Sequence, residues 1–95
     1  MNSLNDRFKQ ANDDYNKFEL IQNKRSQRAD IHAFLILDEL QPGNKDLISA
    51  TGHDTIFLDV DVEQLNIIIT DEQVLELVRA GVMYNREYDC LEMIV

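Results

Sequence analysis

The sequence predicts an α+β fold in which an N-terminal helix or helix pair precedes a small, mainly antiparallel sheet of two β-hairpins with one packed helix. Apolar residues recur at helical steps before Pro42, and their period falls toward that of a strand after it. The chain has 95 residues, of which 44% are hydrophobic and 28% charged, so it can bury one modest core. We expect residues 1–41 to form a helical segment and residues 42–95 an acidic ββαββ body of the same domain.

The first helix is expected over about residues 4–23. Ser3 is a candidate N-cap, and Asp6 places a carboxylate in the first turn, where it is favourable. Apolar side chains then recur at the spacing of an amphipathic helix or a short coiled-coil seam. They are Leu4, Phe8, Ala11, Tyr15 and Phe18. Because this face is too apolar to stay exposed, it packs either on the sheet of this domain or on a second copy of the chain.

A second helix is expected over about residues 28–40, apolar around more than one face and ended by Pro42. The sequence leaves open whether residues 4–40 form one helix or two. Residues 47–51 and 55–62 predict the first hairpin, and residues 82–84 and 90–95 the second. Between them, Thr70 caps a helix over about residues 71–80 that Gly81 ends. The segment QLNIII, residues 64–69, suits either a buried strand or the approach to that helix, and is left unassigned.

The stretch HDTIFLDVDVE, residues 53–63, alternates apolar and polar residues. As a strand it would place Phe57, Asp59, Asp61 and Glu63 along one exposed line, with neighbouring carboxylates roughly 6.5 to 7 Å apart. The three acids resemble the start of a calcium loop. However, Gln64 stands where such a loop needs glycine, and its twelfth position is Thr70 instead of glutamate, which argues against a metal site.

The net charge of −9 lies entirely in the second half of the chain. Residues 1–45 carry seven acids and seven bases, whereas residues 46–95 carry eleven acids and two bases. Such a field repels nucleic acid and anionic membranes and attracts basic protein surfaces. Three interpretations of the acids stay open: mimicry of a phosphate run, a solvated sheet face kept soluble and unpaired, or contacts with other proteins. Mimicry would also use Asp54, Asp71, Glu72 and Glu76.

No motif for catalysis or for a cofactor is found. The chain has no glycine-rich phosphate loop, HExxH, CxxC or GxSxG pattern. We expect His53 to serve a turn, His32 to lie on a helix face, and Cys90 to be a small buried hydrophobe. A single cysteine and an N-terminus without an apolar signal segment lead us to expect a cytoplasmic protein. The absence of catalytic motifs leads us to expect that it is not an enzyme.

The stretches "HAFLILDELQPGNKDLISATGHDTIFLDVDVE" and "DEQVLELVRAGVMYNREYDCLEMIV" resemble small acidic accessory proteins encoded by phages and prophages. The resemblance covers residues 32–95 and rests on the general character of the sequence and not on a diagnostic motif. It supplies no catalytic residue. Such proteins include inhibitors of host enzymes, several of them DNA mimics, which is what the resemblance implies for function.

The sequence thus predicts an interaction or inhibitor protein that binds a basic, nucleic-acid-handling protein without binding nucleic acid or membrane itself. The residues expected to contact this partner are Phe57, Asp59, Asp61, Glu63, Asp71, Glu72 and Glu76. The rival hypothesis is a homo-oligomeric structural or sequestering protein. Its interface would be the aromatic helix face, formed by Leu4, Phe8, Tyr15 and Phe18.

Overall fold

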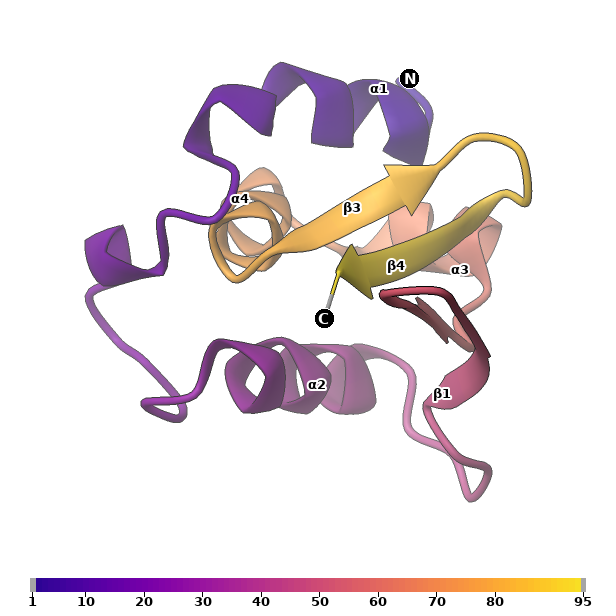
Figure 1. The fold of residues 1–95 in the computed structure, drawn as a ribbon. Helices are drawn as coiled ribbons and strands as arrows, with labels where there is room; N and C mark the ends of the chain where they lie inside the picture. Colours follow the sequence, from indigo (N-terminus) through magenta and orange to yellow (C-terminus); the bar gives the residue numbers. More distant parts are fainter. Residues whose placement is uncertain (1, 95) are drawn as a thin grey trace.

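A computed structural model describes residues 2–94 (Figure 1) and confirms the α+β class. The helical elements are α1 (Leu4–Gln10), two short 3₁₀ turns (Asn12–Asp14 and Phe18–Leu20), α2 (Ala29–Leu40), α3 (Val62–Ile68) and α4 (Asp71–Arg79). The strands are β1 (Ile48–Gly52), β2 (Thr55–Leu58), β3 (Val82–Asn85) and β4 (Cys90–Ile94). In Figure 1, α1 runs along the top, α2 along the bottom, and α4 lies between them behind β3.

Within residues 2–94, the strands form a four-stranded antiparallel sheet in the order β1-β2-β4-β3. The two predicted hairpins are therefore present, and β2 and β4 join them. Leu58 lies opposite Leu91 and Val82 opposite Met93, and all four side chains are buried on one face of the sheet. Because side chains alternate along a strand, Phe57 and Glu92 point to the other face, where both are only partly buried.

The core forms between the sheet and the helices. It includes buried side chains from every α-helix: Leu4, Phe8, Ala33, Ile36, Leu37, Leu65, Val74, Leu77 and Val78. Tyr15 and Phe18 are partly buried against the same cluster. The aromatic face expected to pack on either the domain or a second copy therefore packs within its own chain.

The first helix is shorter than predicted, because α1 ends at Gln10 and 3₁₀ turns replace its continuation. Asn12, Asp13 and Asp14 follow at once, and such side chains compete with the backbone for hydrogen bonds in a helix interior. Asn16 then adopts a left-handed conformation with φ of 61°. Its N–H donates to the carbonyl of Val78 at 3.0 Å, which also accepts from the N–H of Gly81 at 3.0 Å, so the loop is fixed to the end of α4. The question left open by the sequence is thus answered: residues 4–40 contain two separate α-helices.

The second correction concerns residues 59–69. The strand predicted over residues 55–62 ends at Leu58, and the unassigned QLNIII segment belongs to α3. Asp61 caps this helix, and its buried side is built from Leu65, with Val62 and Ile69 packed beside it. The alternation in DVDVE therefore suits a helix start as well as a strand, and here the cap prevails.

The prediction for the remaining elements is confirmed. The second predicted helix is α2. Helix α4 begins with a complete capping box between Thr70 and Gln73, and Gly81 follows the helix with φ of 96°, a conformation that favours glycine. None of the helices described in residues 2–94 has the length and apolar character needed to span a membrane.

Candidate functional site: an acidic face around an aromatic pair

The three carboxylates of residues 59–63 lie on a turn between a strand and a helix, so the predicted strand geometry is wrong. Asp59 is exposed just after β2, and Glu63 is exposed in the first turn of α3. Asp61 is the N-cap: its Oδ1 accepts hydrogen bonds from the N–H groups of Glu63 at 3.1 Å and Gln64 at 3.2 Å. The three acids remain neighbours, but they do not form an evenly spaced line.

The turn that carries these acids is fixed to the end of α2. The side-chain amide of Gln41 donates to the carbonyl of Asp61 at 2.8 Å, and its oxygen accepts from the N–H of Asp61 at 3.0 Å. The N–H of Asp59 also donates to the carbonyl of Leu47 at 2.6 Å. Because the N–H and the carbonyl of Asp61 are both hydrogen-bonded, this turn is already ordered in the free protein. Binding of a partner would therefore cost little conformational entropy here.

Two further carboxylates come from the second hairpin. The hydroxyl of Tyr84 donates to Oδ1 of Asp89 at 3.3 Å, and the amide of Asn85 donates to Oε2 of Glu92 at 3.2 Å. Glu63 lies close enough for its charge to act on Tyr84 as well. Glu63 from the α3 start and Asp89 from the β3–β4 hairpin therefore both act on the Tyr84 side chain.

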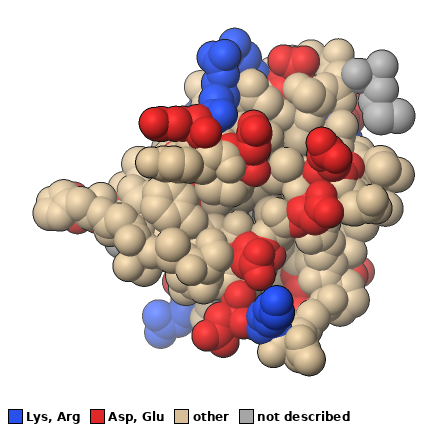
Figure 2. All heavy atoms as spheres, turned by 90° about the vertical axis from the view of Figure 1, so that its right-hand side faces the viewer, with Lys and Arg blue, Asp and Glu red and all other residues tan. Residues whose placement is uncertain are grey.

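An aromatic pair, partly buried Phe57 and exposed Tyr88, lies next to Glu92. Phe57 is opposite Glu92 across the β2–β4 ladder, and its ring meets that of Tyr88 edge-on, with centroids 5.9 Å apart. Tyr88 is 66% exposed. We call this surface the acidic face and define it by Asp59, Asp61, Glu63, Asp89 and Glu92 together with Phe57 and Tyr88. Figure 2 views the side of the molecule where α3 and the β3–β4 turn lie; acidic side chains spread across it, and Lys and Arg stand at its edges.

Burial and, after it, nearby carboxylates disfavour the charged forms of two groups beside the acidic face. Burial, followed by the charge and hydrogen bond of Asp89, raises the pKa of the Tyr84 phenol above its ordinary value. Burial, followed by the charges of Glu92 and Asp89, raises the pKa of the Cys90 thiol. Both groups are therefore neutral at pH 7, and a thiol held in this state is a poor nucleophile.

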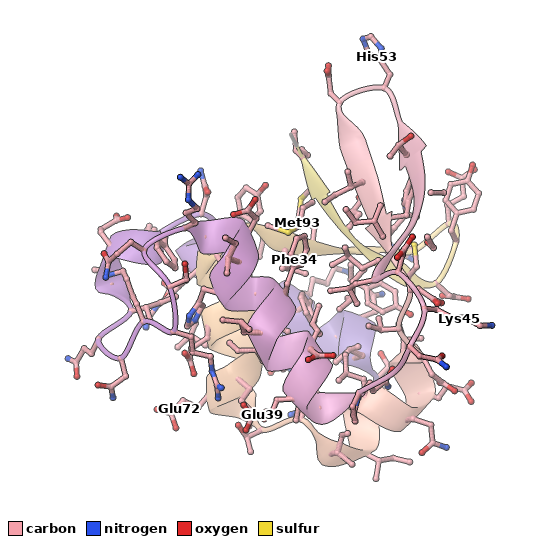
Figure 3. All side chains as sticks on the ribbon, turned by 90° about the horizontal axis from the view of Figure 1, so that it is seen from below. Phe34, Glu39, Lys45, His53, Glu72 and Met93 are labelled. Atoms are coloured by element: carbon pink, nitrogen blue, oxygen red, sulfur yellow. The ribbon has the colours of Figure 1, made fainter. Side chains whose placement is uncertain are left out.

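The structure does not bring the other predicted contact residues to this surface. Asp71 pairs with Arg7 at 2.9 Å, and Glu76 accepts from Nε2 of His32 at 3.2 Å. Glu72 lines a different hollow together with Glu76. Asp54 lies beside His53 at the tip of the β1–β2 hairpin, which projects from the body in Figure 3. Of the seven predicted contact residues, the acidic face keeps Phe57, Asp59, Asp61 and Glu63.

Sequence reasoning missed Tyr88, Asp89 and Glu92. These residues join the site because β4 pairs with β2, and local sequence does not show which strands of two hairpins become neighbours. It also placed His32 on a helix face, whereas the side chain is fully buried. The uniformly apolar neighbours of His32 in α2 were the available signal for burial.

Among residues 2–94, no group of three or more His, Cys, Asp or Glu side chains is arranged to hold a metal ion. Comparison of the chain with protein-family models, with curated proteins and with solved structures found no match. The argument for function therefore rests on the geometry of the chain itself.

Proposed function

We propose that this chain is a non-enzymatic interaction protein, acting as an inhibitor, whose acidic face binds a basic surface on another protein. The observation that supports this most directly is that the side of the molecule where α3 and the β3–β4 turn lie carries many carboxylates (Figure 2) and that the partly exposed Phe57 meets the exposed Tyr88 there. Carboxylates attract a basic partner and orient it, while aromatic side chains supply most of the contact energy at protein interfaces. The acidic face combines both features.

We propose further that the partner is a protein that handles nucleic acid. A binding groove for DNA or RNA is rich in Lys and Arg, and a fixed array of carboxylates can occupy it in place of phosphates. The same charge opposes direct binding of nucleic acid to this chain. The resemblance to phage accessory proteins agrees with this proposal. It stays a prediction, because no comparison tests it.

The rival hypothesis of assembly through the N-terminal helix receives less support. Leu4 and Phe8 are 3% and 4% exposed in the single chain, so an interface there would require α1 to leave its own core. The geometry favours the acidic face as the working surface.

The test uses the intact protein, immobilised and exposed to a bacterial lysate, with bound proteins eluted by a salt gradient. Proteins retained by the wild type are then purified and titrated against a triple variant, Asp59→Asn, Asp61→Asn and Glu63→Gln. Asparagine is as good an N-cap as aspartate, so α3 is retained when Asp61 is neutralised. We expect weaker binding by the variant, a shallower dependence of affinity on salt, and competition by double-stranded DNA for the same partner.

A matched control removes three acids from the opposite half of the chain: Asp6→Asn, Asp13→Asn and Glu19→Gln. These side chains are exposed, and Asp6, like Glu63, lies in the first turn of a helix. The control variant has the same net charge as the test variant, but its substituted acids lie outside the acidic face, so it should bind as the wild type does. If both variants bind the partner equally weakly, net charge alone explains the loss of affinity and the acidic face is not the binding surface. Unchanged affinity of the test variant would also refute the proposal.

A further inference from the structure

The outer side of α2 is apolar and uncovered. Ile31 and Leu35 are 40% and 43% exposed, while Ala33, Ile36 and Leu37 on the other side are buried in the core. In Figure 1 the helix forms the lowest layer of the molecule, and in the view from below in Figure 3 it lies nearest the viewer. A helix that is apolar on both sides is normally covered on both.

Charged residues stand at both ends of this apolar stripe. Positions 28, 31, 35 and 38 fall on one side of a helix of 3.6 residues per turn. Arg28, the N-cap residue, precedes the stripe and Asp38 follows it, and both are exposed. No hydrogen bond or ion pair joins either side chain to another of the described residues 2–94. We call Arg28, Ile31, Leu35 and Asp38 the α2 stripe.

The two charges are placed against the helix dipole. A cation is unfavourable near a helix N-terminus and an anion near a C-terminus, and α2 has Arg28 at its start and Asp38 in its last turn. Helix α2 has no side-chain cap at Arg28 and no basic residue in its last turn. Asp30 supplies a carboxylate in the first turn of α2, so it is the C-terminal end of the helix that lacks an opposite charge.

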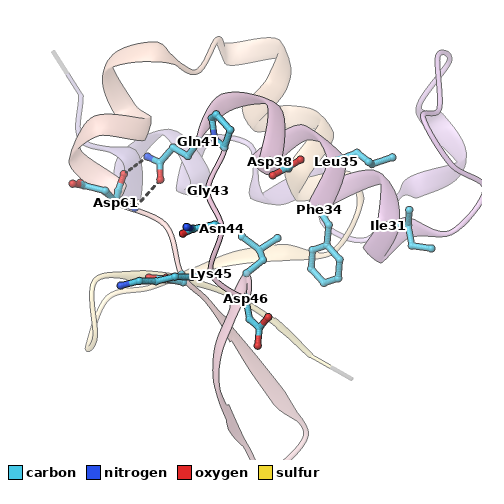
Figure 4. Close-up of a pocket in the computed structure, with 13 residues that line it drawn as sticks. Ile31, Phe34, Leu35, Asp38, Gln41, Gly43, Asn44, Lys45, Asp46 and Asp61 are labelled. Atoms are coloured by element: carbon cyan, nitrogen blue, oxygen red, sulfur yellow. Dashed lines mark hydrogen bonds between the residues drawn. The ribbon is translucent and has the colours of Figure 1, made fainter.

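A groove of about 580 Å³ runs along the C-terminal part of the stripe. Ile31, Phe34 and Leu35 line it from α2, and Asp38, Asp46 and Asp59 stand around it (Figure 4). The single base that lines it, Lys45, extends away from α2 in Figures 3 and 4. The groove is thus apolar along the helix and negative at its rim, and fits an apolar segment that ends in a positive charge.

From these features we infer that two copies of the chain pair through their α2 stripes, with the helices antiparallel. The stripe is self-complementary about position 33: Ile31 of one copy faces Leu35 of the other, and Arg28 faces Asp38. Each contact occurs twice, as an isologous two-fold interface requires. The pairing brings Arg28, at the N-terminal end of one α2, to the acidic rim of the groove in the other copy. The two helix dipoles are then antiparallel, which is the favourable arrangement.

A second copy is the occupant because the sequence of the stripe matches itself in reverse, with the sign of charge exchanged. An unrelated basic segment would satisfy Asp38 but would leave Arg28 unpaired or repelled. An interface centred on one 12-residue helix lies at the small end of the range for specific association. The dimer is therefore expected to be concentration-dependent.

The test is sedimentation equilibrium of the intact protein from about 10 μM to about 1 mM, where weak dimers dissociate. We expect a monomer–dimer equilibrium in the wild type. Arg28→Glu or Asp38→Lys alone should weaken dimerisation about tenfold or more, because two attractive pairs become repulsive. The double variant Arg28→Glu/Asp38→Lys should restore the dimer, since the pairs re-form with exchanged charges.

Two matched variants separate this interface from general effects. Leu35→Asp should abolish the dimer, whereas Leu20→Asp, at a site that is 48% exposed, should not change it. Lys9→Glu has the same effect on net charge as Arg28→Glu and should also leave it unchanged. The three substituted positions of the stripe are exposed, and circular dichroism should show that each variant is folded.

A monomer at all concentrations would overturn the proposal. A dimer that is insensitive to Leu35→Asp, or that the double charge exchange fails to restore, would also overturn it. Of the three acids neutralised in the acidic face, Glu63 alone does not line the groove. Glu63→Gln by itself therefore tests partner binding without altering the dimer interface, and the two losses are measured independently.

Discussion

Substitution of the buried His32 by leucine tests how much the hydrogen bonds of its side chain contribute to the free energy of unfolding. Nδ1 of His32 accepts from the backbone N–H of Arg25 at 3.0 Å, so the ring proton resides on Nε2, which donates to Oε1 of Glu76 at 3.2 Å. The ring also meets Phe18 edge-on, with centroids 5.6 Å apart. This one fully buried side chain therefore links α2 to the loop before it, to α4 and to the second 3₁₀ turn.

The loss can be worked out contact by contact. Leaving the N–H of Arg25 without its acceptor costs about 1 to 2 kcal/mol. The bond to Glu76 contributes about 1 kcal/mol, a reduced value because the carboxylate side chain is 27% exposed and water can replace the partner. The edge contact with Phe18 adds about 0.5 to 1 kcal/mol, and the apolar leucine recovers part of the sum. We expect the free energy of unfolding to fall by about 2 to 3 kcal/mol, or Tm by roughly 10 to 20 °C.

The assay is equilibrium unfolding in urea at pH 7, with His32→Asn and His32→Gln for comparison. Asparagine can retain an acceptor for the N–H of Arg25, and glutamine can retain a donor for Glu76, so each should lose less stability than leucine. A cycle with Glu76→Gln should give a coupling of about 1 kcal/mol between the two side chains. A leucine variant as stable as the wild type would refute the assignment of both hydrogen bonds.

Three further predictions follow from single residues. Asp61→Ala should lower the free energy of unfolding by about 1 kcal/mol, whereas Asp61→Asn should leave it nearly unchanged, because only alanine removes the cap of α3. Urea unfolding measures both variants, and equal losses of stability would contradict the capping role. The raised pKa of Cys90, caused by burial and then by Glu92, means that its stabilising effect is complete below the ordinary value of 9.0 and is lost as pH rises through the folded pKa. The free energy of unfolding should thus fall less between pH 8 and 10 in Cys90→Ala than in the wild type. Glu92→Gln should speed alkylation of the native Cys90 thiol at pH 8. An unchanged alkylation rate would mean that the Glu92 carboxylate does not raise the pKa of the thiol. Arg7→Met should lower Tm by roughly 5 to 15 °C, because the guanidinium also donates to the carbonyls of Asn66 at 3.0 Å and Ile69 at 2.8 Å; a scanning calorimeter would detect this, and a shift under about 2 °C would mean that water replaces these bonds.

The elements that the sequence predicted well are those with complete local signals. Helix α4 has its capping box at one end and Gly81 at the other, and α2 stops before Pro42. Each signal acts within a few residues, so no knowledge of tertiary contacts was needed. The same holds for the turn at residues 53–54, where Asp54 adopts φ of 64° between β1 and β2.

The errors arose where one pattern satisfies two structures. Apolar residues at Val60 and Val62 alternate as in a strand, yet Val62, Leu65 and Ile69 also recur at helical steps. The Asp61 side chain decides between them by bonding the first free N–H groups of α3. In α1 the apolar spacing continued past Gln10, but the polar run of residues 12–14 ended the helix while Tyr15 and Phe18 still reached the core.

The acidic face was predictable only in part, for a topological reason. Asp59, Asp61 and Glu63 are close in sequence, and their exposure follows from charge alone. Asp89 and Glu92 join them only because the second hairpin adds β4 to the free side of β2, a contact between residues more than 30 positions apart. The pairing also sets Phe57 beside Tyr88, and thereby gives the carboxylates an apolar anchor.

The apolar sequence of α2 has a different explanation on each side of the helix. A helix with residues such as Ile31, Phe34, Leu35 and Leu37 around its circumference needs cover on more than one face, and the sheet and α4 supply only one. If a single fold were the only requirement, Ile31 and Leu35 could be polar without loss to the core, and Arg28 and Asp38 would be better placed with their charges exchanged. The outer stripe therefore departs from what stability of the monomer favours. Both departures are accounted for when the second cover is another copy of the same helix, running in the opposite direction.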